Sequence, residues 1–223
     1  MANKITIDGF NGTGKSTLAK NMAKELNYTY ISTGVVYRCL SYVMMENGIK
    51  GKDIAGICKL FDTMQLTLPN NDNPDVILNG KVVTKEIKDM KYAILSKEYS
   101  DNPLIQAPIR DFIRKFSENC NVIVDGRDSG RLLFPDAMLK IALTASLDVR
   151  AARRQAENKD PSISLEEVKE QIKKIDAELI AENCVPPEDA IEIDTSNMSE
   201  RDVLARALQL FRNCQPAKTK ETN

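Results

Sequence analysis

Residues 9–16 constrain this chain more than any other segment. They read G-F-N-G-T-G-K-S, which fits the pattern G-x-x-x-x-G-K-[S/T]. A β-rich run at residues 4–8 precedes the motif and a helical pattern at residues 15–26 follows it, as its geometry requires. Such a loop presents backbone N–H groups and the positive end of a helix, and both attract a polyphosphate. The segment therefore predicts a P-loop that binds a nucleoside triphosphate.

The positions within this motif have separate roles in holding the triphosphate. Glycines let the backbone approach closely, because a Cβ would occupy the space that phosphate oxygens need. Lys15 supplies a point charge for the β and γ phosphates, and Ser16 offers its hydroxyl to Mg²⁺ as a metal ligand. The competing interpretation is a glycine-rich turn that binds nothing, and the strand and helix around the motif argue against it. We expect ATP and Mg²⁺ to bind at Gly9, Gly12, Thr13, Gly14, Lys15, Ser16 and Thr17.

The rest of the chain alternates predicted strands and helices, which is typical of a parallel sheet covered on both faces. Further strands are expected at residues 28–31, 121–125, 139–144 and 190–194. Helices are expected at residues 35–46, 84–99, 107–119, 148–158, 164–182 and 200–213. Asn79-Gly80 between two β runs predicts a hairpin in an antiparallel insert at residues 64–83. We therefore predict one domain over residues 1–223, of class α/β, with a three-layer α/β/α P-loop NTPase fold and about five parallel strands.

Composition removes several classes of function. The chain has no histidine, which excludes histidine triads, most zinc sites and imidazole acid–base catalysis. Its net charge of −1 lacks the basic excess of proteins that bind nucleic acid polymers or membrane surfaces. No apolar run is long enough to span a membrane, no secretory signal is recognised, and five cysteines without a C-x-x-C pair indicate free thiols. We expect a cytoplasmic protein, and a monomer by default.

Basic residues outside the P-loop distinguish a kinase from other P-loop proteins. A GTPase would carry an N-K-x-D guanine reader, and residues 158–160 lack its spacing. A motor or ATPase module would usually belong to a longer chain. A kinase of a small acceptor must neutralise a second anion and the phosphoryl group in transfer. Candidates for that role are Arg38, Arg127, Arg131, Arg150, Arg153 and Arg154. These residues indicate an ATP-dependent phosphotransferase.

Four segments resemble the bacterial cytidylate kinases. Residues 124–137, VDGRDSGRLLFPDA, are similar to the family's G-R-D-x-G-T-V-V-F-P-D-A, and residues 32–38, STGVVYR, to its D-[ST]-G-x-x-Y-R. Residues 150–154, RAARR, resemble its R-A-x-R-R lid helix, and residues 193–196, IDTS, its I-D-[ST]-[ST]. The resemblance runs in order from about residue 4 to residue 211. It implies transfer of a phosphoryl group from ATP to CMP or dCMP, giving ADP and CDP or dCDP.

The resemblance also implies roles for individual residues. Thr33 and Arg38 would contact the acceptor nucleotide, Arg127 its phosphate and Asp128 its base. The insert, at about residues 60–88, would bind the acceptor, and a helical lid at about residues 150–176 would close over the phosphates. Lys15, Arg127, Arg150 and Arg154 would be catalytic, and Arg153 would bind ATP. The competing interpretation makes Arg38 a helix-face charge, Asp128 a turn cap and the lid arginines a solvated surface.

The sequence departs from the family pattern around the acceptor. Gln106 stands where the family has an arginine about twenty positions before the G-R-D glycine, and Arg131 replaces a threonine. Of the family's R-D-x-x-D-x-x-R, residues 175–182 keep only Asp176, and Ser32 replaces an aspartate. Charged hydrogen bonds are worth about 1.5–3 kcal/mol each, so losing several would weaken acceptor binding by about 10³-fold unless other groups replace them. We hypothesise that Arg131 takes over part of the phosphate contact.

Three functions therefore stay open. The first is a nucleoside monophosphate kinase for CMP, dCMP or a related pyrimidine nucleotide. The second is a kinase of another small acceptor, such as a modified nucleotide or an intermediate of a specialised pathway. The third is a non-catalytic nucleotide-binding module, against which the intact Lys15, Ser16 and Arg127 argue. The altered stretch at residues 175–182 weakens the first without excluding it.

Overall fold

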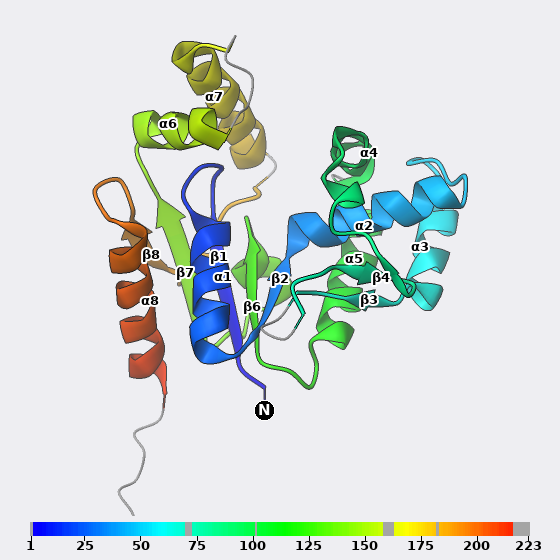
Figure 1. Cartoon of the computed structure of the whole chain (residues 1–223), viewed down its shortest axis with the longest axis horizontal. Coiled ribbons are helices and arrows are strands. Elements are labelled where there is room, and N and C mark those ends of the chain that lie inside the picture. Colours follow the sequence, from blue (N-terminus) through cyan, green and yellow to red (C-terminus); the bar gives the residue numbers. More distant parts are fainter. Residues whose placement is uncertain (1, 70–72, 101, 158–162, 182, 216–223) are drawn as a thin grey trace, which may run out of the picture. The chain divides into compact units, whose positions relative to one another are not determined.

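The computed structural model describes residues 2–69, 73–100, 102–157, 163–181 and 183–215 (Figure 1). The chain divides into two compact units. The first contains Met1–Asn3 and Ala23–Gly126, and the second contains Lys4–Met22 and Arg127–Asn223. Among the described residues, no helix combines the length and the apolar character needed to cross a membrane.

The first unit contains two parallel strands with helices. Strand β2 (Thr29–Ser32) pairs with β6 (Val122–Gly126), with Ile31 opposite Val124, and both of these side chains are fully buried. Helix α2 follows β2 directly and packs against α4. The helical elements of this unit are α2 (Thr33–Glu46), α3 (Ile54–Thr63), the 3₁₀ turn η1 (Glu86–Lys88), α4 (Met90–Ser100) and α5 (Pro103–Phe116).

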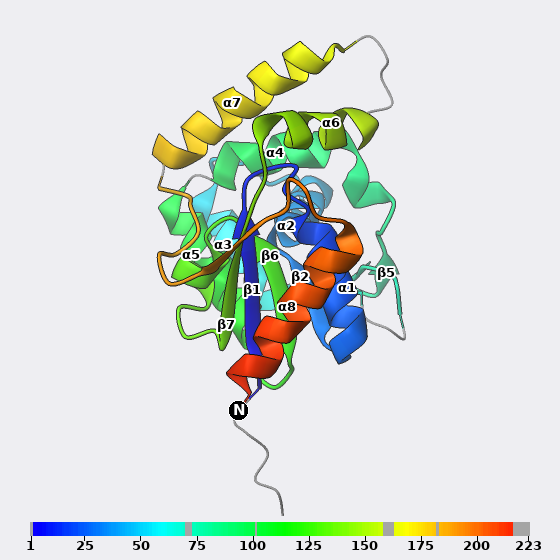
Figure 2. The same cartoon turned by 90° about the vertical axis from the view of Figure 1, so that its left-hand side faces the viewer.

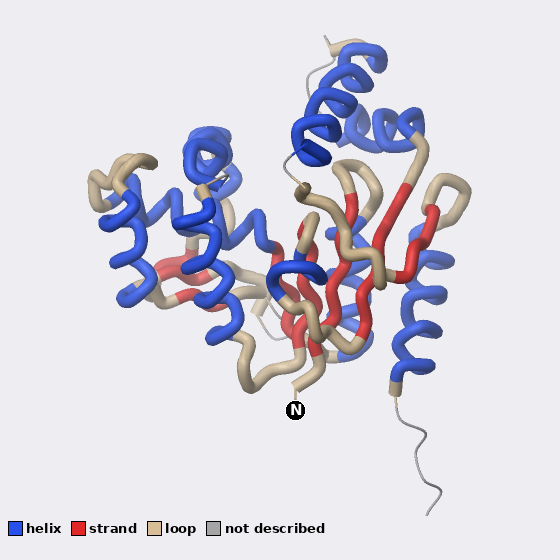
Figure 3. Tube along the Cα trace, turned by 180° about the vertical axis from the view of Figure 1, so that it is seen from behind, coloured by secondary structure: helices blue, strands red, loops and turns tan. Residues whose placement is uncertain are grey.

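A small antiparallel sheet also belongs to the first unit (Figure 3). Its strands are β3 (Leu66–Thr67), β4 (Ile77–Leu78) and β5 (Lys81–Val82). Asn79 and Gly80 join β4 to β5 with φ values of 50° and 79°, and a type I′ two-residue hairpin turn needs positive φ at both positions. The predicted hairpin is therefore confirmed, whereas the role of residues 60–88 as an acceptor-binding insert stays a prediction.

The second unit holds three parallel strands, β1 (Lys4–Gly9), β7 (Leu139–Thr144) and β8 (Ile191–Asp194). Ile7 lies opposite Ile141, which in turn lies opposite Ile191. Helix α8 (Glu200–Cys214) packs on β7. Helix α6 (Leu147–Glu157) packs against α7 (Leu165–Ala181), as Figure 2 shows. Helix α1 (Lys15–Leu26) begins in this unit. Apolar side chains on both faces of the central strands explain why residues 139–144 read as a nearly continuous apolar run.

The predicted fold class is confirmed. The order of the five parallel strands is β2-β6-β1-β7-β8, and strands alternate with helices along the chain. A capping box begins α7, because Ser164 and Glu167 exchange side-chain and backbone hydrogen bonds. The single-domain assignment and the lid at residues 150–176 stay predictions.

Several elements differ from the sequence prediction. Helix α5 begins at Pro103, four residues earlier than expected, because Asn102 caps it and proline is well suited to the first helical position. The helix predicted at residues 84–99 is interrupted at Asp89, which separates η1 from α4. Helix α3, capped by Asp53, and the π-helical turn η2 (Ser129–Leu133) were not predicted.

Candidate active site

The P-loop connects β1 to α1 and has the backbone that its glycines predict. Gly9, Gly12 and Gly14 have φ values of 147°, 80° and 93°, a range that side-chain-bearing residues rarely adopt. A Cβ at Gly9 would lie 2.3 Å from the carbonyl oxygen of Leu143, whereas a Cβ at Gly14 would meet no atom within 4 Å. The loop is therefore packed against β7 on one side and open at Gly14, where a ligand can approach.

The Phe10 carbonyl oxygen organises the side chains of this loop. It accepts hydrogen bonds from Lys15 Nζ at 2.8 Å and from Thr13 Oγ1 at 2.9 Å. Thr13 is buried, while Lys15 and Ser16 reach the surface of the cavity beside the loop. The ammonium group of Lys15 is thus held at the loop in an arrangement that suits a polyphosphate.

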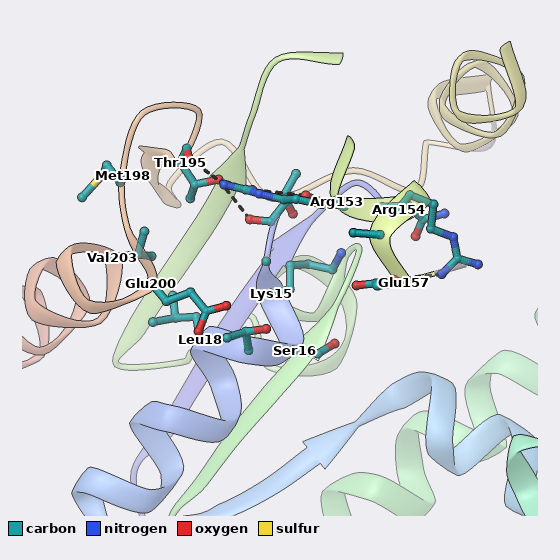
Figure 4. A pocket seen from close by; sticks show the side chains of 16 residues that line it. Lys15, Ser16, Leu18, Arg153, Arg154, Glu157, Thr195, Met198, Glu200 and Val203 are labelled. Atoms are coloured by element: carbon teal, nitrogen blue, oxygen red, sulfur yellow. Dashed lines mark hydrogen bonds and ion pairs between the residues drawn. The ribbon is translucent and has the colours of Figure 1, made fainter. Parts of the chain in front are cut away.

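A cavity of about 500 Å³ lies over the P-loop (Figure 4). This volume falls within the usual range of small-molecule sites. Arg153 and Arg154 of α6 line it, as do Thr195, Met198 and Val203 from the segment after β8 and the start of α8. Two cationic side chains facing the lysine and serine of the loop fit a triphosphate with its Mg²⁺, and Met198 and Val203 add apolar surface suited to a nucleoside.

Arg153 joins three parts of this site. Its Nη1 donates to the carbonyl of Gly12 at 3.2 Å and to Thr195 Oγ1 at 2.9 Å, and its Nη2 donates to the Thr195 carbonyl at 2.8 Å. Thr195 is buried, and its hydroxyl also lies 3.1 Å from the carbonyl oxygens of Thr13 and Thr144. The planar guanidinium therefore ties α6, the P-loop and the end of β8 together at the cavity wall.

The other two arginines of α6 have different surroundings. Arg150 is buried, and its Nη2 lies 2.6 Å from Asp176 Oδ2 of α7 while its Nη1 donates to the Asn11 carbonyl at 3.4 Å. Arg154 is largely exposed and forms a 3.2 Å ion pair with Glu157. Arg150 thus links the P-loop to α7, whereas the head group of Arg154 is the more accessible of the two.

The loop carrying Arg127 and Asp128 lies in the same unit as the P-loop. Arg127 is exposed, and Asp128 lies 3.7 Å from Arg131, whose Nη2 also donates to the carbonyl of Asn183 after α7. Neither Arg127 nor Arg131 is part of the wall of the P-loop cavity. A role for Arg131 in holding the acceptor phosphate stays a prediction.

Asp8 holds this loop and was missed by the sequence analysis. It is fully buried at the end of β1, and its two carboxylate oxygens accept the N–H groups of Ser129 at 2.8 Å and Gly130 at 2.7 Å. Burial raises the pKa of Asp8 to about 6, while these hydrogen bonds oppose the increase. A carboxylate between the apolar Ile7 and the first glycine of the P-loop was the available signal.

The remaining predicted acceptor residues belong to the first unit. Thr33 Oγ1 donates to the Asp125 carbonyl at 3.2 Å, and Arg38 Nε donates to the Gly34 carbonyl of its own helix at 3.2 Å. Gln106 donates to the Ser100 carbonyl at 2.8 Å, so its amide is occupied by the backbone. That these residues contact an acceptor stays a prediction.

Arg110 is a candidate that the sequence analysis missed. It lies one helical turn after Gln106 in α5, and its Nη1 donates to Gln106 Oε1 at 3.4 Å. It also follows a hydrophobic residue, Ile109, as the family's arginine does. Residues four positions apart in a helix lie on nearly the same face. Arg110 can therefore present its guanidinium on the helix face where the family's arginine was expected at Gln106.

The stretch that departs most from the family pattern lies at the end of α7. Leu179 is buried in the second unit, Ile180 is 59% exposed, and Asp176 is engaged by Arg150. Glu182 lies outside the described residues. Of the apolar residues in this stretch, Leu179 therefore packs in the interior and Ile180 lies on the surface. Neither supplies a charge for an acceptor.

Comparison with known proteins identifies the family. The family model "Cytidylate kinase" matches residues 5–213. The chain is 38% identical over 214 residues to a cytidylate kinase of Caldanaerobacter subterraneus, covering 94% of each chain. It is 35% identical over 215 residues to one of Carboxydothermus hydrogenoformans, covering 93% of this chain and 96% of the relative.

Solved structures agree on the fold. A structure from Thermus thermophilus has a TM-score of 0.50 at 15% identity and covers 97% of this chain and 99% of its own. An uncharacterised protein from Eubacterium ventriosum has a TM-score of 0.50 at 14% identity, with coverage of 94% and 98%. These likenesses carry the fold alone, whereas the family match and the curated relatives extend over nearly the whole sequence. The chain belongs to the cytidylate kinase family of phosphotransferases.

Proposed function

We propose that this protein transfers the γ-phosphoryl group of ATP to CMP or dCMP and releases ADP with CDP or dCDP. The observation that carries the proposal is the cavity of about 500 Å³ over an intact P-loop, lined by Lys15, Ser16 and two arginines of α6. Membership of the cytidylate kinase family supports CMP as the acceptor.

On the donor side, the P-loop backbone binds the phosphates, and Gly12, Thr13, Gly14 and Thr17 frame their positions. Lys15 binds the β and γ phosphates, and Ser16 directs its hydroxyl to Mg²⁺. Mg²⁺, when bound, offsets negative charge on the β and γ oxygens. Arg153 keeps the cavity wall in place through Thr195, and the exposed head of Arg154 contacts phosphate in the closed lid.

On the acceptor side, Arg127 binds the phosphate and Asp128 accepts hydrogen bonds from the base. Thr33 and Arg38 contribute further contacts, and Arg131 supplies additional positive charge. We propose that Arg110, next to Gln106, takes the place of the family's arginine. Arg110 would then supply one of the positive charges that this chain lacks at the family's acceptor positions.

In the transfer step, an oxygen of the acceptor phosphate forms a bond to the γ-phosphorus, and the bond from that phosphorus to the β–γ bridging oxygen breaks. Lys15, Arg127, Arg150 and Arg154 stabilise the charge on the group in transfer, in a site from which the lid excludes water. No side chain has to exchange a proton with the acceptor phosphate, which agrees with a chain that contains no histidine. We also expect the protein to act as a cytoplasmic monomer.

The test is ADP release with ATP and Mg²⁺ over a panel of acceptors: CMP, dCMP, UMP, dUMP, AMP, GMP and dTMP. Turnover with CMP or dCMP above all others supports the proposal. Lys15→Ala should abolish it, and Lys20→Ala, an exposed lysine on the same helix, should not.

ATP binding that depends on Lys15, without turnover of any acceptor in the panel, would overturn CMP as the substrate. It would favour the kinase of a different small acceptor. Absence of ATP binding would instead support a protein that has lost the donor site.

A further inference from the structure

Asp8 is a buried carboxylate for which neither the phosphate-binding loop nor the proposed transfer step has a use. It directly precedes Gly9, the first residue of the P-loop, and its side chain is inaccessible to solvent. A buried charge is costly unless it is well hydrogen-bonded, so its partners indicate what it does. Those partners are backbone N–H groups 121 and 122 residues further along the chain.

Both oxygens of this carboxylate are used. One accepts from Ser129 N at 2.8 Å, and the other accepts from Gly130 N at 2.7 Å. Two successive N–H groups on one carboxylate fix both the position and the direction of the backbone that carries them. That backbone directly follows Arg127 and Asp128, which the proposed function assigns to the acceptor.

The space around the contact is closed. A Cβ on Gly130 would lie 2.7 Å from Thr6 Oγ1, 3.0 Å from Pro187 Cγ and 3.3 Å from Asp8 Oδ2. Glycine at this position therefore lets the loop come close enough for both hydrogen bonds. A side chain here would push the loop away from β1.

We propose that Asp8 is a positioning residue that fixes the loop of residues 127–131 against β1 and thereby sets the affinity for the acceptor nucleotide. This inference rests on the proposed function for the identity of the acceptor. The contact between Asp8 and the loop is independent of that function. Because of this contact, the end of β1 holds the acceptor loop through Asp8 and begins the P-loop at the next residue, Gly9.

The contact should weaken in mild acid. Burial raises the pKa of Asp8 to about 6, and the carboxylate of Asp128 contributes in the same direction. A protonated Asp8 presents a hydroxyl to one of two N–H groups that both need an acceptor, so one hydrogen bond is lost. Acceptor affinity should therefore fall as the pH drops through about 6. The phosphate of the acceptor titrates in the same range, so a variant that cannot titrate is needed for comparison.

The test compares Asp8→Asn with Thr6→Val. Asparagine keeps the shape of the side chain but turns an NH₂ toward one of the two N–H groups. Thr6 lies two residues earlier on the same strand, is equally buried, and its Oγ1 has no hydrogen-bond partner among the described residues, so Thr6→Val is a matched control. Losing a charged hydrogen bond should raise the acceptor KM about ten- to hundredfold in Asp8→Asn. Thr6→Val should leave it unchanged.

Two further readouts separate positioning from general damage. The Kd of ATP, measured by calorimetry, should change less than about twofold in Asp8→Asn, a difference well below one lost hydrogen bond. Amide hydrogen exchange of residues 127–134 should become faster in Asp8→Asn at pH 7.5 and in the wild type at pH 5.5, after correction for intrinsic exchange. The acceptor KM of the wild type should rise more than that of Asp8→Asn between these pH values.

Several outcomes would overturn the inference. They are equal loss of ATP and acceptor affinity, unchanged exchange at residues 127–134, or the same pH dependence in both proteins. If Asp8→Asn does not fold, Gly130→Ala moves the loop from the opposite side and should give the same selective loss. If the wild type does not turn over CMP, the proposed function fails, and the exchange measurement alone still decides whether Asp8 holds the loop.

Discussion

The P-loop and the loop of residues 127–131 lie in the same unit and are built differently. The P-loop carries its own phosphate-binding groups within eight consecutive residues, and side chains from α6 and from the end of β8 add hydrogen bonds to its backbone. The second loop is held from outside, by Asp8 from β1 and by Arg131 bound to the carbonyl of Asn183. Binding groups within one segment can be recognised as a motif, whereas an externally held loop depends on residues that no local pattern connects.

The largest effect should come from the P-loop. Lys15→Ala removes the charge at the β and γ phosphates and should lower kcat about 10³-fold, the scale for removing one charge stabiliser from a transition state. Steady-state ADP release measures it, and circular dichroism should show an unchanged fold. A reduction below tenfold would mean that the cavity arginines, rather than the motif, carry the donor charge.

Asp8, which holds the second loop, should make the free energy of unfolding depend on pH. The pKa of Asp8 is raised to about 6 in the folded protein, from an ordinary value of 3.8 that applies to the unfolded chain. Its contribution to stability is therefore complete below about pH 4 and is lost as the pH rises through about 6. The free energy of unfolding of the wild type, relative to Asp8→Asn, should fall by about 2–3 kcal/mol between pH 4 and pH 7. Urea unfolding over this range measures it, and a constant difference would contradict the origin of the shift.

Arg153 tests whether the P-loop is as independent as its motif suggests. Arg153→Lys keeps the charge but loses the fork that binds Thr195 twice and Gly12 once, so the KM for ATP should rise about tenfold. The acceptor KM should change little. An unchanged KM for ATP would mean that the P-loop needs no support from α6 or β8.

Arg131 should give the smallest effect. It is about one-third exposed and pairs with Asp128 at 3.7 Å, so Arg131→Ala should raise the acceptor KM about three- to tenfold, in keeping with modest surface ion pairs and one lost backbone hydrogen bond. Arg38→Ala provides the comparison on the acceptor side, and Arg114→Ala, another exposed i,i+3 pair, is the control. No change in KM or kcat would refute a role in phosphate binding.

Much of the fold could be predicted from local patterns. The five parallel strands, the hairpin at Asn79-Gly80 and the capping box at Ser164 each follow from nearby residues whose chemistry is specific. Helix α3 was missed because its signals, Asp53 as a cap and a short apolar stretch, are weak in a ten-residue helix. The start of α5 was missed because Pro103 was not taken as the first helical residue.

The candidate site divides in the same way. The P-loop residues of the cavity, with Arg153 and Arg154, could be named in advance because each belongs to a motif, whereas Met198, Glu200 and Val203 were not named. Asp8 and Arg110 were not named, because the partners of Asp8 lie 121 and 122 residues away and Arg110 lies one helical turn from the position that was considered. No local pattern indicated that Arg150 and Asp176 form a buried ion pair, because the two residues lie on different helices.

The wall of the donor cavity has a consequence for the order in which the chain becomes functional. Gly12 precedes its partner Arg153 by 141 residues, Arg153 is hydrogen-bonded to Thr195, and Met198, Glu200 and Val203 also line the cavity. Translation proceeds from the N-terminus, and contacts of high sequence separation form late. A nascent chain that ends before β8 therefore lacks the wall that a nucleotide needs. Protection by ATP against proteolysis should arise only in fragments that extend past about residue 203.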